Sequence, residues 1–138
     1  MFEICEGGAM KSKRLLKFYF AADSLNRALD NLITQNALAS ADGFLNGEFY
    51  AERILELVCA KKELNALWRH LDGVISGFSE SEKKVLRYYG TMRGGTAKLP
   101  AETVREIKRV TVKFKRRLRN IERFAEGIRL VYGFYTLF

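Results

Sequence analysis

The chain has little of what metal proteins and disulfide-stabilised proteins need. Its 138 residues include one histidine, two cysteines and one proline. The two cysteines, Cys5 and Cys59, lie far apart and form no CxxC pair, so neither a zinc site nor a disulfide framework is indicated. We therefore expect no bound metal ion.

Motifs for nucleophilic catalysis and for phosphate-binding loops are also missing. The sequence contains no GxSxG, P-loop, GxGxxG or HExxH pattern, and its carboxylates are scattered without an evident acid–base pair. His70 and Asp72 are two residues apart and would face different directions on a helix, so they form no dyad. These absences predict a protein that is not an enzyme, with no cofactor and no small-molecule substrate.

Long apolar runs are absent as well. No stretch approaches the ~20 apolar residues that a membrane-spanning helix needs, and the first nine residues lack the apolar segment of a secretory signal. The run 128–138 is apolar nearly all round, which favours a buried helix over contact with an anionic membrane surface. The expected location of the protein is the cytoplasm.

The composition of the first nine residues indicates a leader that is not part of the folded domain. Glu6-Gly7-Gly8-Ala9-Met10 can be encoded by a purine-rich sequence that resembles a bacterial ribosome-binding site just before an ATG. We expect translation to start at Met10, with residues 1–9 as a misannotated or disordered leader and residues 10–138 as a single helical domain. The same pattern indicates a bacterial or phage origin.

Apolar periodicity predicts an all-α fold. A hydrophobic content of 48% excludes a disordered chain. Three long amphipathic helices are expected over about 12–39, 48–78 and 100–135, with the last uninterrupted at least over 103–121, and a short helix begins at the Ser79–Glu82 capping box. The near-heptad apolar seams favour an antiparallel helical bundle of three long helices and one short helix. The same seams would also suit a homodimer.

Positive charge is concentrated in the second half of the chain. The net charge is +8, and residues 79–138 carry 15 basic and 6 acidic side chains, whereas residues 1–78 carry 9 and 10. No acidic residue occurs from Ile107 to Ile121. Like charges four residues apart on a helix, such as Arg109 and Lys113, repel each other slightly, and a polyanion would relieve that cost. This asymmetry is typical of a protein that binds nucleic acid or an acidic surface.

The basic side chains of the last helix fall on the face opposite its apolar seam. At 100° per residue, Ile107, Phe114 and Ile121 point one way and most of the basic residues point the other. Arginine-rich helices bind phosphates through bidentate, charge-assisted contacts. The predicted nucleic-acid-binding residues are Arg105, Lys108, Arg109, Lys113, Lys115, Arg116, Arg119 and Arg123.

Two short segments resemble a family of transcription proteins. The segment Phe78–Tyr89, which reads FSESEKKVLRYY, is similar to the opening helix of bacterial sigma-factor region 4 and of some phage late-gene transcription regulators. The segment Thr111–Arg119 resembles the start and basic continuation of their recognition helix. The tight turn of a helix-turn-helix is not evident between them. The resemblance implies DNA binding and transcriptional control.

Two functions are left open by the sequence. The first is a non-catalytic protein that contacts DNA or RNA phosphate through its Arg/Lys-rich last helix and has a role related to transcription. The second is a structural or adaptor bundle that self-associates and binds an acidic protein partner. A further alternative is that the basic face is neutralised internally by acidic residues of the first two helices, namely Asp30, Glu52, Glu56 and Glu63.

Overall fold

Every regular element in the described part of the chain is helical, as the sequence predicts. The computed structural model describes residues 2–41 and 47–137, with side chains described for 12–41 and 47–133. The elements are α1 (Phe2–Ala41), α2 (Gly47–Ile75), α3 (Glu80–Thr91), α4 (Ala101–Arg117), the 3-10 turn η1 (Ile121–Phe124) and α5 (Ala125–Leu137). None of the helices in these ranges has the length and apolar character that crossing a bilayer requires.

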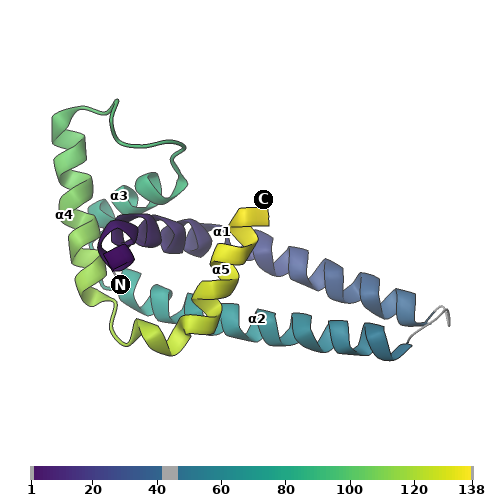
Figure 1. Cartoon of the computed structure of the whole chain (residues 1–138). Helices are drawn as coiled ribbons and strands as arrows, with labels where there is room; N and C mark the ends of the chain where they lie inside the picture. The colour runs from purple at the N-terminus through teal and green to yellow at the C-terminus, as the bar shows by residue number, and fades with distance from the viewer. Residues whose placement is uncertain (1, 42–46, 138) are drawn as a thin grey trace.

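The two longest helices, α1 and α2, run antiparallel and form the frame of the fold (Figure 1). At one end of this hairpin α3 packs on α1 and α4 packs on α3, while α5 crosses α2 and also touches α1. The other end projects beyond α5, as Figure 1 shows. We call this projecting part, residues 30–41 and 47–62, the arm.

The buried core lies where all the helices meet. Most of the core residues that come from α1 and α2 are leucines. Each of these two helices buries one apolar stripe against the other. Phe114 of α4 and Phe18 of α1 are among the largest fully buried side chains. The main core cluster contains Leu15, Leu16, Phe18, Leu29, Leu57, Leu64, Leu67, Leu71, Ile75, Phe78, Leu86, Val110, Phe114, Ile128 and Val131.

The prediction of one unbroken last helix is wrong. Leu118 is extended, with φ −74° and ψ 102°, and Asn120 is left-handed, with φ 53°. Asparagine enters the left-handed region more readily than most residues. A continuous helix would carry Ile128 ~21 Å beyond Phe114, whereas the break lets Ile128 and Val131 turn back into the core. Within the described residues, five α-helices replace the expected three long helices and one short helix.

Glycine permits two close helix crossings. A Cβ at Gly127 of α5 would lie 3.0 Å from the carbonyl oxygen of Glu63, and a Cβ at Gly90 of α3 would lie 2.9 Å from the Cβ of Leu16. A larger residue at either position would push the helices apart. Gly127 therefore serves close packing of α5 on α2, and the change of direction comes earlier, at Leu118–Asn120.

The backbone of the N-terminal segment is helical from Phe2 on, and α1 runs through Gly7 and Gly8. The helix over residues 2–9 is continuous with the rest of α1. The expectation that residues 1–9 form a misannotated or disordered leader stays a prediction, and so does the start of translation at Met10.

Candidate nucleic-acid interface

The Ser79–Glu82 capping box begins α3, as predicted. The Ser79 hydroxyl accepts a hydrogen bond from the Glu82 backbone N–H at 3.2 Å, and the Ser79 backbone N–H donates to Glu82 Oε1 at 3.1 Å. This reciprocal pair satisfies two of the backbone donors that every helix start leaves open. It also fixes the Glu82 carboxylate at the first turn of α3, within reach of α4.

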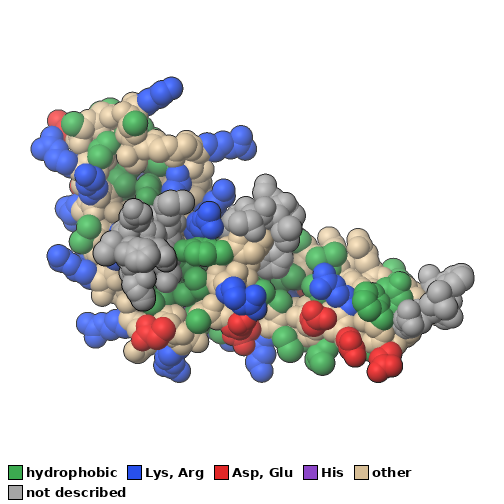
Figure 2. All heavy atoms as spheres, in the orientation of Figure 1, with side chains coloured by type: hydrophobic (Ala, Val, Ile, Leu, Met, Phe, Trp, Pro, Cys, Tyr) green, Lys and Arg blue, Asp and Glu red, His purple; other side chains and the backbone are tan. Residues whose placement is uncertain are grey.

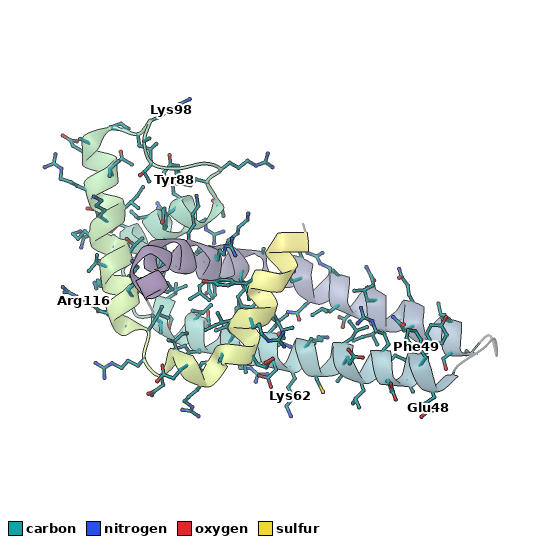
Figure 3. The ribbon with its side chains drawn as sticks, viewed as in Figure 1. Glu48, Phe49, Lys62, Tyr88, Lys98 and Arg116 are labelled. Atoms are coloured by element: carbon teal, nitrogen blue, oxygen red, sulfur yellow. The ribbon has the colours of Figure 1, made fainter. Side chains whose placement is uncertain are left out.

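The orientation of α4 is set by its apolar stripe. Ile107, Val110 and Phe114 are buried, and they are spaced by three and four residues so that they share one helix face. The opposite face turns outward. Figure 2 shows Lys and Arg side chains along the outer edge of α4, and Figure 3 shows Arg116 pointing away from the body of the protein.

Five of the predicted cations lie side by side on this outward face. Together with one exposed apolar residue, Val112, they line a shallow hollow of about 630 Å³. Val112 is 43% exposed and is the apolar member of this lining. We call this surface the α4 strip; it consists of Arg105, Lys108, Arg109, Val112, Lys113 and Arg116.

A single carboxylate, that of Glu82 in α3, bridges two cations of the α4 strip. Lys113 Nζ donates to Glu82 Oε2 at 2.9 Å and to Oε1 at 3.1 Å. Arg109 Nη1 lies 3.4 Å from Glu82 Oε2, and Arg109 Nη2 donates to Glu106 Oε1 at 2.6 Å. Repulsion between Arg109 and Lys113, which the sequence suggests a polyanion would relieve, is therefore already offset inside the protein.

The environment of Glu82 strongly favours its charged form. The ammonium of Lys113 and the backbone N–H of Ser79 bond to the Glu82 carboxylate, and these contacts lower its pKa from 4.5 to about 2. The Glu82 side chain is only 9% exposed. The Arg109 guanidinium also lowers the pKa of Glu106. Both carboxylates are thus ionised at neutral pH and hold their cations in place.

Among the described side chains, the acids expected to neutralise the basic face make no ion pair with the α4 strip; they are Asp30, Glu52, Glu56 and Glu63. Asp30 pairs with Lys61 at 2.6 Å, and Glu56 lies 3.9 Å from Arg53, so both serve the α1/α2 hairpin. Lys61 lies three residues before the buried Leu64 on α2, and its pairing with Asp30 explains why a lysine is found there. The acid that reaches the α4 strip from another helix is Glu82.

The remaining predicted cations divide into two groups. Arg105, Lys108 and Arg116 are exposed on the α4 strip, and among the described side chains none of them has an ion-pair partner. Lys115 is exposed near the C-terminal end of α4 and lies outside the residues that line the hollow. Arg119 and Arg123 are exposed but follow the end of α4, so the break separates them from the strip.

Arg117 has a different role from its neighbours. Its Nη1 donates to the carbonyl oxygen of Gly77 at 3.1 Å, and its guanidinium lies 4.9 Å from the centre of the Phe78 ring. These contacts tie the end of α4 to the α2–α3 connection. Arg117 therefore has a structural role at the end of α4.

A second cationic hollow, not predicted from the sequence, lies between α1 and the segment after α3. Its lining includes Lys13, Lys17, Arg93 and the ring of Phe20. Lys13 Nζ donates to the carbonyl oxygen of Gly94 at 2.6 Å. The cluster of lysine and arginine at positions 11–17 is the signal that could have pointed to it, but these residues lie 76 to 82 positions before Arg93 in the chain.

The low pKa of Glu82 predicts a loss of stability in acid. A carboxylate whose pKa falls on folding stabilises the folded state fully above its unfolded pKa, and this contribution is lost as the pH falls through the folded value. For Glu82 the window runs from about 4.5 down to about 2. Urea midpoints measured across this window should fall more in the wild type than in Glu82→Gln. The variant Glu102→Gln, which removes an exposed carboxylate of α4 without an ion-pair partner among the described side chains, is the control. Equal acid sensitivity of wild type and Glu82→Gln would contradict this role.

Comparison with protein-family models, with curated proteins and with solved structures finds no match to this chain.

Proposed function

We propose that the protein is a non-catalytic nucleic-acid-binding protein that contacts the phosphates of DNA or RNA through the α4 strip. The observation that carries this proposal is the outward position of Arg105, Lys108 and Arg116, which share one surface and have no carboxylate partner among the described side chains. Ordinary exposed helices balance their cations with acids at i,i+3 or i,i+4. Here the acids balance Arg109 and Lys113 only.

The two kinds of cation on the α4 strip would act differently. Arg105, Lys108 and Arg116 are the residues that bind phosphate, the arginines through paired N–H donors and the lysine as a point charge. Arg109 keeps its bonds to Glu106 and Glu82, so it adds positive potential with a fixed orientation. Contacts of this kind position the protein on a nucleic acid and carry no sequence information.

A setting in transcription is the finer part of the proposal. Its support is the resemblance of Phe78–Tyr89 and Thr111–Arg119 to sigma-factor region 4 and to phage late-gene regulators. The capping box that opens the first of these segments begins α3, and most of the second segment lies on α4. A bacterial cytoplasmic protein of this kind would use the antiparallel helical bundle as a rigid support, with the α1/α2 hairpin as its frame.

The second candidate function is that of a structural or adaptor protein that self-associates and binds an acidic protein partner. The observation that favours it is the arm, where Leu38, Phe49 and Leu55 are all exposed. Large exposed apolar side chains gathered on one projecting part mark interaction surfaces more often than scattered ones do. Self-association and nucleic-acid binding use different parts of the molecule, so each is tested separately.

A salt series on the wild-type protein tests nucleic-acid binding. Fluorescence anisotropy of labelled random duplex DNA and single-stranded RNA should show binding at low salt. Three to five phosphate contacts predict that log Kobs for duplex falls with log salt at a slope of roughly −3 to −4.5. Absence of binding to either probe at low salt would end the proposal, and a slope near zero would exclude phosphate contact as its basis.

A further inference from the structure

The outer face of α2 in the arm carries an apolar strip. Leu55 is 64% exposed and Val58 is 46% exposed, and Ala51 and Cys59 are exposed beside them. The buried Leu57 marks the opposite face of α2, which packs against α1. Because residues two positions apart on a helix point in nearly opposite directions, Leu55 points away from α1.

Opposite charges stand at equal distances on either side of Leu55. Glu48 comes seven residues before it and Lys62 seven residues after it, and a spacing of seven keeps all three on one line of the helix. Figure 3 shows the Glu48 and Lys62 side chains on the side of α2 away from α1. Within the described residues neither side chain takes part in an ion pair.

We propose that this face of α2 binds a second copy of the chain, packed antiparallel with Leu55 of one copy against Leu55 of the other. In this register Glu48 of each copy meets Lys62 of the other, so both ends of the interface form an ion pair. Twofold symmetry brings the same surface together from both subunits and therefore requires a self-complementary pattern. Glu48 and Lys62, at equal distances on either side of Leu55, form such a self-complementary pattern.

The symmetry of the charges selects a second copy over an unrelated partner. A different protein would need only a complementary surface and would not require Glu48 and Lys62 to be equidistant from Leu55. The other large exposed apolar residues do not extend the pattern. Leu38, for example, lies on α1, nine residues after the buried Leu29 and so on the opposite face of that helix.

In this register the parts of the two copies that lie outside the arms, with α3, α4 and α5, are at opposite ends of the dimer. Residues 48–62 span ~21 Å of helix, and α5 crosses α2 just outside this range, at Glu63. The second copy therefore does not compete with α5 for α2. An interface of one helix pair this short belongs to the small, weak class of protein contacts, so dimerisation is concentration-dependent. The two α4 strips would be about 60 Å apart, counting ~20 helical residues on each side of Leu55.

The first test measures mass in solution by sedimentation equilibrium, without nucleic acid, over a concentration series into the millimolar range. The wild type should approach twice the 15.8 kDa chain mass. Leu55→Asp should stay monomeric throughout. Leu38→Asp is the matched control, because Leu38 is the same residue type on the same arm with a similar exposure of 62%, and it should dimerise like the wild type. A monomeric wild type, or equal loss in both variants, would overturn the proposed interface.

The second test uses charge exchange and does not depend on an apolar change. Glu48→Lys places two lysines together at each end of the dimer, and Lys62→Glu places two carboxylates together, so each variant alone should be monomeric at concentrations where the wild type dimerises. An equimolar mixture of the two variants restores an opposite-charge pair at both ends and should form heterodimers. Circular dichroism of each variant confirms that it is folded. Failure of the mixture to associate would overturn the register. Both tests proceed without nucleic acid, so their outcome is independent of the proposed binding function.

Discussion

Reversing two charges on the α4 strip, in Lys108→Glu/Arg116→Glu, should weaken nucleic-acid binding by about 100-fold or more without unfolding the protein. Hydrogen bonds to charged groups contribute about 1.5–3 kcal/mol each, so the loss of two of them corresponds to a factor of this size or greater. Both residues are exposed and lack ion-pair partners among the described side chains, so the free energy of unfolding should change by less than about 1 kcal/mol. Anisotropy titrations and urea unfolding measure the two quantities.

The matched control is Arg27→Glu/Arg69→Glu. It makes the same change in net charge, but its residues are exposed on α1 and α2 and do not line the hollow of the α4 strip. Affinity should fall much less in the control, because phosphate contacts act locally and a change in net charge acts only through the screened field of the whole protein. Equal losses in both double variants would show that binding follows net charge and that the α4 strip is not the site.

Arg109 is unsuitable for this experiment, although the sequence places it at the centre of the basic face. Glu82 and Glu106 both bond to its guanidinium. Arg109→Glu would place a third carboxylate beside those of Glu82 and Glu106. A loss of binding in this variant could therefore follow from a displaced contact between α3 and α4. The structure thus separates the cations that hold α4 in place from those that are exposed for a ligand.

Local sequence signals predicted most of the helices. The Ser79–Glu82 capping box gave the start of α3 because both of its hydrogen bonds join residues three positions apart. Pro100 immediately precedes α4, where its fixed φ suits the start of a helix. The outward face of α4 followed from the period of Ile107 and Phe114. Each of these signals depends on residues that are within about two helical turns of one another.

The break after α4 was not predictable from the same periodicity. The spacing of Phe114, Leu118, Ile121 and Ile128 continues the helical pattern through the break. Each of these residues is apolar because it makes its own contact with the core. What ends α4 is the burial gained when α5 turns back onto α2, and this gain depends on the placement of helices distant in the sequence. Asn120 was the only local cue.

The partner of Arg109 and Lys113 was missed for a related reason. A capping box explains one oxygen of Glu82, and the sequence offers no sign that its carboxylate also reaches α4. Glu82 and Lys113 are 31 residues apart, so their contact exists only because α3 and α4 pack together. Long-range pairs of this kind decide which members of a basic cluster are neutralised, and periodicity cannot assign them.

Replacing Phe114 by alanine should lower the free energy of unfolding by about 3–5 kcal/mol, since the ring is fully buried at 0% exposure and its loss leaves a cavity in the core. Val112→Ala, two residues earlier on the same helix, shortens a smaller side chain that is 43% exposed and should have much less effect on stability. Urea unfolding of both variants measures the difference. A small effect of Phe114→Ala would mean that α4 does not pack as the structure has it, and the outward orientation of the α4 strip would lose its basis. A large effect, together with normal stability of the Lys108→Glu/Arg116→Glu variant, would establish that α4 divides into an anchoring face and a face free to bind.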